Sequence, residues 1–406
     1  MRLLILTQYY PPEIGAPQNR LHELAVRLKA LGMEVEVLTA MPNYPKMEVF
    51  DAYKSGKIRE EFIDGVKVYR AGIYVSKSKS VIPRLLNYFS FVWTSWRRGR
   101  KLSSYDFLMV ESPPLFLGYS AMALSRKLKA KLIFNVSDLW PESAEKLGIV
   151  TNKQLLGLAY RLEQKCYRHA KLITGQTMGI VEDISKRFPD KKVYWLPNGV
   201  DVKFYDPALY SENEFRVRNG FKKDDLIFFY GGILGHAQGL QTLIHAAQLV
   251  RSHPEIQMIL QGAGPEKEML QQLKKELGAT NVHFHPPVPK SEMPEILKSV
   301  DVALVPLRKL ELFTGAIPSK IFEALAMEKA LLLGVDGEAR MHFIDRAEAG
   351  VFFEPENEND LAQKMILLAS DPSMIREKGR NGRNYVSMHF NRDKIATDFI
   401  EELQKH

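Results

Sequence analysis

The sequence predicts two α/β domains, each built on a doubly wound parallel sheet with helices on both faces. Its 406 residues are too many for one ordinary hydrophobic core and suit two domains of about 200 residues. Short apolar runs alternate with amphipathic helical patterns, which is typical of parallel sheets. This alternation starts again near residue 226, so we expect two sheets rather than one long sheet.

The first-half elements follow from this alternation. Residues 2–8 form a short apolar run, as in a strand that is buried on both faces. The next helix carries Leu21, Leu24 and Leu28 at helical spacing and ends at Gly32. Further strands are expected at residues 35–38, 107–110, 131–136 and 172–174.

The second half repeats the order of strand and helix. An amphipathic helix between Leu240 and Val250 follows the first strand of this half. The turn residues Pro197, Asn198 and Gly199 mark the boundary, giving domains of residues 1–196 and 197–391. Composition leaves open whether a last helix, residues 392–406, packs back onto the first domain. Strands are expected at residues 226–230, 257–261, 282–284, 302–305 and 330–334.

Composition points to a cytoplasmic globular protein. Apolar residues make up 45% and charged residues 26% of the chain, which is ordinary for a soluble protein. The one cysteine, Cys166, lies at a core position of a helical pattern and has no partner for an internal disulfide, as suits a reducing compartment. The apolar N-terminus is expected to be a strand rather than an export signal, and no apolar run reaches 18 residues.

Ligand sites in open α/β sheets lie outside the carboxyl ends of the strands. One such loop leads into a helix at Ser319, a good N-cap residue, and a helix start can hold a phosphate. Lys320 adds a positive charge there. Glu323 lies one turn further and can accept hydrogen bonds from a ribose, or it simply favours the helix dipole. The loops at such ends are residues 11–20, 231–239, 262–267 and 314–320.

Two of these loops are rich in glycine. Gly232 and Gly235 lie in the stretch GGILGHAQG, and Gly262 and Gly264 in the stretch GAGP. Glycine lets a backbone approach a phosphate or a sugar closely. The dinucleotide fingerprint G-x-G-x-x-G is absent, and an ordinary turn between strand and helix is the alternative.

At this point the sequence resembles a known family. The stretches LPNGVD, QGAGPEKEML, VDVALVPL, PSKIFEALAMEKALLLG and AGVFFEPEN are similar to retaining glycosyltransferases of family 4, which have the GT-B fold. The resemblance covers nearly the whole chain. The stretches GILGHAQGL, QYYPPEIGAPQNR and DLWPES resemble a bacterial surface-polysaccharide subgroup that includes the N-acetyl-L-fucosamine transferase-like enzymes.

The resemblance implies two Rossmann-like domains that face each other across a cleft. It also implies a nucleoside diphosphate sugar donor and a polyprenyl-linked saccharide acceptor. The expected donor is linked to UDP and carries an N-acetylated deoxyhexosamine. The pathway would be the synthesis of O-antigen, capsule or exopolysaccharide. No metal and no further cofactor are expected, since no Cys, His and Asp spacing suggests a metal site.

The family's site residues carry over only in part. Glu323 matches a glutamate that binds ribose, whereas the acidic partner eight residues earlier is Gly315 here. The family's basic pair falls on Ile233 and Gln238, so Lys320 is the expected substitute, with Arg308 as an equal candidate. The donor-binding set is therefore expected to be Gly15, Gly232, Gly235, Gln238, Gly262, Gly264, Ser319, Lys320, Ile321 and Glu323.

Candidate catalytic groups of the first domain are acidic. Many relatives place a histidine in the mid-domain loop, but the loop VESPPLFLG has none. Glu111, Asp138 and Glu142 are the polar groups nearby, and we take Asp138 and Glu111 as the catalytic candidates. A carboxylate there can orient the acceptor hydroxyl or take its proton. The alternative for Asp138 is that it caps the following helix.

A basic and aromatic segment predicts contact with a membrane. Residues 71–105 contain seven Lys or Arg and no acidic residue, and residues 1–200 carry 31 Lys and Arg against 18 Asp and Glu. An apolar stripe that is flanked by cations is typical of an interfacial helix. The alternative is a core helix with a basic end, and the wide apolar stripe argues against nucleic acid. The residues expected at the anionic inner face of the cytoplasmic membrane are Arg84, Trp93, Trp96, Arg97, Arg98 and Arg100.

Two other functions stay open. One is a nucleotide-sugar epimerase of the same fold, although the sequence offers few histidines for its chemistry. The other is a nucleotide-sugar-binding protein without catalysis, which the glycine at position 315 and the absent basic pair favour.

Overall fold

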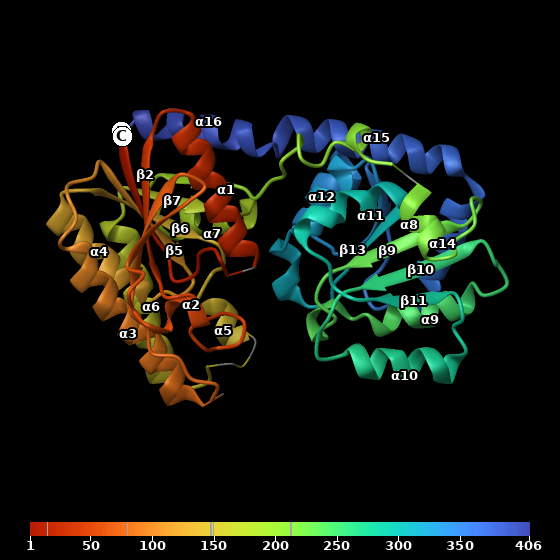
Figure 1. The fold of residues 1–406 in the computed structure, drawn as a ribbon, viewed down its shortest axis with the longest axis horizontal. Helices are drawn as coiled ribbons and strands as arrows, with labels where there is room; N and C mark the ends of the chain where they lie inside the picture. The colour runs from red at the N-terminus through yellow and green to blue at the C-terminus, as the bar shows by residue number, and fades with distance from the viewer. Residues whose placement is uncertain (14, 79, 147, 149, 212) are drawn as a thin grey trace. The chain divides into compact units, whose positions relative to one another are not determined.

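The computed structural model describes residues 1–13, 15–78, 80–146, 148, 150–211 and 213–406. The chain divides into two compact units, residues 1–198 with 392–406, and residues 199–391 (Figure 1). The division after residue 198 lies two residues from the expected boundary. Helix α16 (Arg392–Gln404) packs against α1 (Ala16–Ala30) of the first unit, which settles the question that composition left open.

The first unit is built on an eight-stranded sheet of strand order β3-β4-β2-β1-β5-β6-β7-β8. All neighbouring pairs are parallel except β3 and β4. The strands are β1 (Arg2–Leu6), β2 (Glu34–Ala40), β3 (Glu60–Ile63), β4 (Val66–Ala71), β5 (Phe107–Ser112), β6 (Lys131–Val136), β7 (Leu172–Gly175) and β8 (Val193–Trp195).

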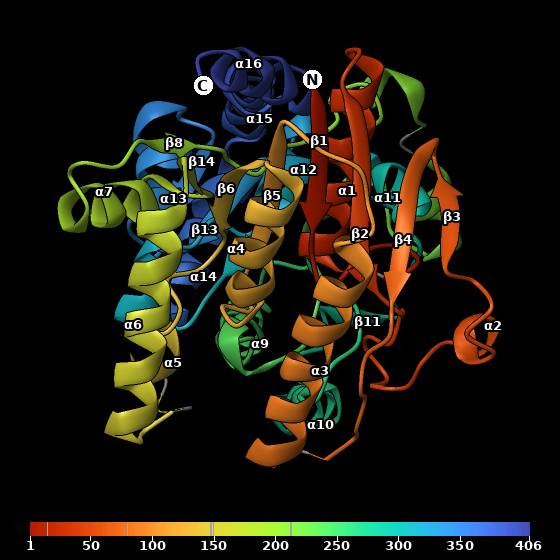
Figure 2. The ribbon, with the colours of Figure 1, turned by 90° about the vertical axis from the view of Figure 1, so that its left-hand side faces the viewer.

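Helices cover both faces of this sheet because its strands are apolar on both faces. Leu4 and Leu6 point to one core, beneath α3, α4 and α6, while Leu3 and Ile5 point to the other, beneath α1 and α16. Figure 2 shows α3, α4 and α6 as one layer. The remaining helices are α2 (Asp51–Lys54), α3 (Val81–Gly99), α4 (Leu117–Leu128), α5 (Glu142–Lys146), α6 (Lys153–His169) and α7 (Met178–Arg187).

The strands β3, β4, β8 and β14 were not expected from the sequence. β3 and β4 form an antiparallel hairpin whose turn residues, Asp64 and Gly65, both have positive φ. Asp-Gly is a strong signal for such a turn, so this hairpin could have been found. β8 and β14 have only three residues each, which is too short for a periodic pattern.

The second unit is built on a six-stranded parallel sheet of order β11-β10-β9-β12-β13-β14. Phe228 and Tyr230 of β9 face a core shared with α9 and α14, and Phe229 faces α11 and α12. The strands are β9 (Leu226–Gly231), β10 (Ile256–Gln261), β11 (Val282–His285), β12 (Val302–Pro306), β13 (Ala330–Gly334) and β14 (Gly350–Phe352). The helices are α8 (Asn213–Arg218), α9 (Gln241–Leu249), α10 (Lys267–Leu277), α11 (Met293–Ser299), α12 (Lys320–Ala326), α13 (Glu338–Arg340), α14 (Glu358–Ser370) and α15 (Pro372–His389).

Candidate functional site

The second sheet has its topological switch point between β9 and β12. From β9 the chain moves to β10 and β11 on one side, whereas β12, β13 and β14 lie on the other side. Ligands of doubly wound sheets bind at such a point, outside the carboxyl ends of the strands. Here the loop after β9, the segment after β12 and the start of α12 supply the surrounding residues.

The two glycine-rich loops pack directly against each other. The Gly232 N–H donates to the Gln261 carbonyl at 2.9 Å, and the Leu234 N–H donates to the Ala263 carbonyl at 2.9 Å. A Cβ at Gly262 would lie 1.8 Å from the Gly232 carbonyl oxygen, in a backbone of φ 149°. The loop contact thus accounts for this glycine, whose predicted contact with a donor stays a prediction.

Gly264 and Gly235, the other two predicted glycines of these loops, differ in how much room the structure leaves for a side chain. A Cβ at Gly264 would lie 2.2 Å from the Leu234 carbonyl oxygen, so the same loop contact requires this glycine. Gly235 has an extended backbone, and the atoms nearest to a Cβ there would be side-chain atoms of Ile233, Gln238 and Pro265, at 3.3 Å or more. Close loop packing therefore depends on position 264 rather than on position 235.

Gly262→Ala is expected to lower stability, because neither the steric contact nor the backbone conformation tolerates a side chain. We expect a loss of more than about 1 kcal/mol in the free energy of unfolding. Urea unfolding would measure it, with Gly315→Ala as the control, since a Cβ at Gly315 meets nothing within 4 Å. Equal stability of the two variants would contradict the account.

Lys320 is the cation at the switch point. Its Nζ atom lies 3.7 Å from the centre of the Tyr230 ring, and a Cβ at Gly232 would be 3.0 Å from the same atom. Burial lowers the pKa of Lys320 to about 7, and the nearby Glu323 carboxylate opposes this shift. The Tyr230 ring is held in place by its hydroxyl, which donates a hydrogen bond to the Ile233 carbonyl at 2.6 Å. Sequence reasoning missed Tyr230, although it directly precedes the Gly-Gly turn.

The start of α12 differs from the expectation at two residues. Ser319 precedes the helix with helical dihedrals, and its side chain makes no capping hydrogen bond. Ile321 is fully buried, and its N–H already donates to the Pro318 carbonyl at 3.1 Å. The Phe322 N–H likewise donates to Ser319 at 3.2 Å. The Ile321 side chain therefore belongs to the core, and the predicted donor contact of this residue stays a prediction.

Glu323 lies in the first turn of α12, as expected. Together with Lys320, Gly231 and Met293, it lines a small pocket of about 40 Å³. Gly315 ends a short 3₁₀ turn, and a Cβ there would meet open space. The position that holds an acid in the resembling family therefore has room for a side chain that this chain lacks.

The two alternative donor contacts have their own partners. Arg308 Nε lies 3.2 Å from Glu356 Oε1, so its charge is already balanced. The backbone N–H of Gln238 donates to the Gly235 carbonyl at 3.2 Å, and its side chain is half-buried beside that glycine. Lys320 is consequently the stronger candidate for a phosphate contact.

In the first unit, Glu111 belongs to a buried network. Its Oε1 atom lies 2.6 Å from Arg20 Nη2 and accepts a hydrogen bond of 2.5 Å from Ser137, while Asn135 donates to Oε2. Glu111 and Arg20 are both buried. These contacts occupy the carboxylate, so the structure places Glu111 as the group that positions Arg20 rather than as a free base.

Asp138 and Gly15 lie at the carboxyl ends of β6 and β1. The half-buried Asp138 accepts a hydrogen bond of 2.5 Å from the Ser143 hydroxyl in α5, which is a contact between side chains and leaves the capping alternative open. Gly15 directly precedes α1 in extended backbone, and a Cβ there would lie 2.4 Å from Gln18 Oε1. Asp138 keeps its second carboxylate oxygen for another partner more readily than Glu111 does.

Helix α3 exposes the apolar stripe that its sequence predicts. Ile82 is 72% exposed and Trp93 is 60% exposed, and Leu86 and Phe89 lie between them on the same side. Phe91 is buried and turned to the sheet. The alternative of a core helix is therefore wrong for this side of α3.

The predicted cations of α3 do not all behave alike. Arg84, Arg97 and Arg100 are exposed, and Arg100 stacks on the half-buried Trp96 at 4.7 Å. Arg98 instead forms an ion pair of 2.5 Å with Glu60 and lies 5.7 Å from the centre of the Tyr69 ring. Its predicted membrane contact stays a prediction, and its guanidinium is already engaged by Glu60 and Tyr69 of the neighbouring strands.

The described residues contain neither a cluster of metal ligands nor a membrane-spanning helix. Within the ranges that the structure describes, no three His, Cys, Asp or Glu side chains are grouped as metal ligands. No helix of these ranges is both long and apolar enough to cross a bilayer.

Glycosyltransferase family models match both units of the chain. Residues 15–199 match the glycosyl transferase 4-like domain, and residues 211–385 match the glycosyl transferases group 1 family. The chain is 24% identical over 416 residues to the putative colanic acid biosynthesis glycosyl transferase WcaI of Escherichia coli, with both chains fully covered.

Solved structures share the fold at low identity. One is Anabaena HepE in complex with UDP-glucose, with a TM-score of 0.71, 17% identity and full coverage of both chains. Another is WaaG, a glycosyltransferase involved in lipopolysaccharide biosynthesis, with a TM-score of 0.69, 17% identity and coverage of 98% and 99%.

Proposed function

Because the chain is a glycosyltransferase of the GT-B fold and of the family 4 type, we propose that it moves a sugar from a nucleoside diphosphate to a lipid-linked saccharide, with retention of the anomeric configuration. The observation that carries this proposal is Lys320, a half-buried cation beside Gly232 at the switch point. Relatives support the class of substrate, since HepE binds UDP-glucose and WcaI is named for colanic acid synthesis. A UDP-linked, N-acetylated deoxyhexosamine is the proposed donor, and O-antigen, capsule or exopolysaccharide is the proposed product.

The proposed mechanism uses this chain's own groups and no further cofactor. The diphosphate gains negative charge as the glycosidic bond breaks, and a fixed cation at that point lowers the barrier. We assign this role to Lys320 and propose that Glu323 accepts hydrogen bonds from the ribose, since both line the same small pocket. Asp138 of the first unit is proposed to orient the acceptor hydroxyl.

The test is a transfer assay with purified protein, a panel of UDP-, GDP- and dTDP-sugars, and membrane extract containing polyprenyl-diphosphate sugars. We expect nucleotide release and a lipid-linked product from one donor. Glu323→Ala should lower transfer about 10- to 100-fold, because a hydrogen bond to a charged group is worth about 1.5–3 kcal/mol. Glu276→Ala, on the exposed face of α10, is the matched control.

Other outcomes of this assay would contradict the proposal. An isomerised nucleotide sugar without transfer would identify an epimerase. Nucleotide binding without turnover across the whole panel would identify a binding protein.

A pair of substitutions separates the two acids of the first unit. Asp138→Asn is expected to lower turnover at least tenfold with little change in stability, since it leaves a hydrogen-bond acceptor for Ser143. Glu111→Gln is expected to lower stability by about 3 kcal/mol, because it leaves Arg20 buried without a counter-charge. Thermal unfolding and initial rates measure both. Loss of turnover in Glu111→Gln at unchanged stability would reverse the assignment.

We further propose that the layer of α3, α4 and α6 binds the anionic inner face of the cytoplasmic membrane, where the acceptor would lie. α3 and α4 contain no acidic residue, and Glu163, the one acidic residue of α6, is buried and paired with Arg187 at 2.7 Å. Tyr119, Leu155 and Leu158 add exposed apolar side chains to this layer. Such a basic and apolar surface suits an interface with anionic lipid.

A further inference from the structure

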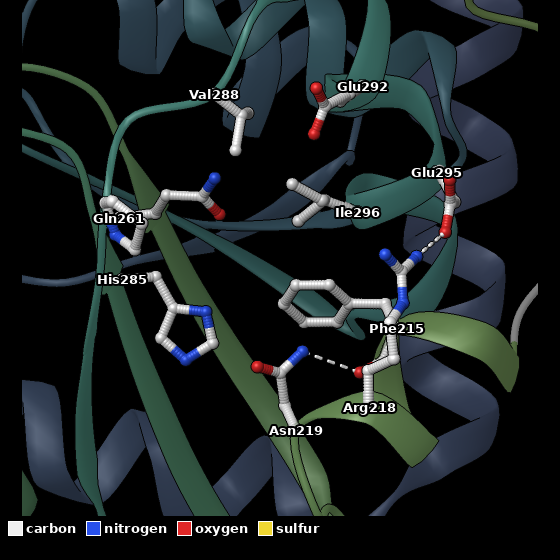
Figure 3. Close-up of a pocket in the computed structure, with 10 residues that line it drawn as sticks. Phe215, Arg218, Asn219, Gln261, His285, Val288, Glu292, Glu295 and Ile296 are labelled. Atoms are coloured by element: carbon white, nitrogen blue, oxygen red, sulfur yellow. Dashed lines mark hydrogen bonds and ion pairs between the residues drawn. The ribbon is translucent and has the colours of Figure 1, made fainter.

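A second cavity of the second unit is not used by the proposed mechanism. It has a volume of about 250 Å³ and lies between α8, α11 and the carboxyl ends of β10 and β11 (Figure 3). Glu292 and Ile296 line it, whereas Met293 and Leu297 line the pocket of Lys320. The two sites are thus on different sides of α11.

The floor of this cavity holds an unsatisfied polar group. Gln261, the last residue of β10, is 2% exposed, and its buried Oε1 atom has no hydrogen-bond partner among the residues that the structure describes. Figure 3 shows its amide pointing into the cavity, toward Ile296. A buried acceptor without a donor costs about 1–3 kcal/mol, so the position suits a ligand that brings an N–H or O–H group.

Two aromatic side chains line the cavity beside this amide. The Phe215 ring lies 5.7 Å from the His285 ring, and both line the cavity with the buried Ile296. Burial lowers the pKa of His285 and so favours the neutral imidazole, which offers one donor and one acceptor. These side chains therefore combine an apolar face with hydrogen-bonding groups of both kinds.

The rim is polar and carries both signs of charge. Arg218 is ion-paired with Glu295, and Glu292 and Asn219 are exposed beside them (Figure 3). Two carboxylates at the mouth disfavour a phosphate. A neutral ligand that has several hydroxyl groups satisfies such a rim without burying a charge.

We propose that this cavity binds one pyranose ring of a saccharide, at a site separate from the donor pocket. Sugar hydroxyls donate to Gln261 and Glu292, and the apolar face of the ring packs on Phe215. The cavity volume of about 250 Å³ suits one sugar ring rather than a whole nucleotide. This site goes beyond the proposed transfer reaction, because it holds a sugar that does not react.

Saturation-transfer NMR on the full chain tests the proposal with glucose, galactose and N-acetylglucosamine as probes. We expect weak binding of at least one sugar, and its signals should persist when UDP saturates the donor pocket. Calorimetric UDP binding in the same sample shows whether the donor site works, so failure of the proposed function and failure of this inference are distinguishable. No sugar signal, or a signal that UDP abolishes, would overturn the inference.

Gln261→Leu gives the decisive comparison. It removes the unsatisfied amide, so we expect an equal or higher unfolding temperature together with at least a tenfold weaker sugar signal. Gln272→Leu on exposed α10 makes the same chemical change away from the cavity and should alter neither. Unchanged sugar binding in Gln261→Leu would show that the sugar binds elsewhere.

Discussion

Replacing Lys320 with methionine is expected to weaken UDP binding about 10- to 100-fold and, in the same protein, to raise the temperature of unfolding. The loss follows because a hydrogen bond to a charged group contributes about 1.5–3 kcal/mol. The unfolding temperature is expected to rise because burial lowers the pKa of Lys320 to about 7, so the folded protein disfavours the charged ammonium. Methionine replaces the ammonium over the Tyr230 ring with an uncharged thioether of similar length.

The same residue predicts how stability depends on pH. Between pH 7 and the ordinary lysine value of 10.5, Lys320 binds fewer protons in the folded than in the unfolded protein. The free energy of unfolding therefore rises with pH over this window, and the methionine variant should lack that contribution. Urea unfolding at pH 7 and pH 9.5 in both proteins measures the difference.

UDP binding should show the opposite dependence on pH. The diphosphate favours the charged ammonium, so binding takes up a proton above pH 7, and affinity falls by up to about tenfold per pH unit. Calorimetry in buffers of different ionisation enthalpy counts this proton directly.

Lys275→Met, on the exposed face of α10, is the matched control and should leave affinity and proton uptake unchanged. Wild-type binding that is independent of pH, or a methionine variant that binds UDP as tightly, would remove Lys320 from the donor site.

Elements with a periodic pattern over many residues were predictable from the sequence, whereas very short elements were not. The strands beginning at Arg2 and Leu226 are apolar on both faces and are followed by long amphipathic helices, so their order predicts a parallel sheet. The three-residue strands β8 and β14 have no such pattern and depend on their neighbours in the sheet. Helix α16 pairs with α1 through contacts far apart in the chain, which composition does not encode.

The sequence predicts which residues of the chain belong to the candidate site, but not which other residues they contact. The sequence places Lys320 at a helix start. The burial of its ammonium group, however, depends on Tyr230, which lies on strand β9. Gly262 suggests room for a ligand, whereas the structure fills that room with the neighbouring loop. Pairing partners such as Glu60, which engages Arg98, follow from tertiary packing alone.

Neutralising two exposed arginines of α3 should weaken binding to anionic vesicles about 30-fold. In Arg97→Gln/Arg100→Gln, two cations are lost at about 1 kcal/mol each. Co-sedimentation with vesicles of anionic and of neutral lipid measures the change, and the difference should shrink at 1 M salt, where the Debye length is about 3 Å. Trp93→Ser should weaken binding in a way that salt does not remove, because the tryptophan side chain contributes apolar area.

Arg98→Gln is the informative control for this surface, since it removes the same charge from the same helix turn. Its guanidinium is already paired with Glu60, so we expect less than a twofold change in vesicle binding, together with a small loss of stability. If Arg97→Gln and Arg98→Gln weakened binding equally, net charge rather than the exposed side of α3 would govern the interaction. If neither the double variant nor the serine variant changed binding, the layer of α3, α4 and α6 would not face the membrane.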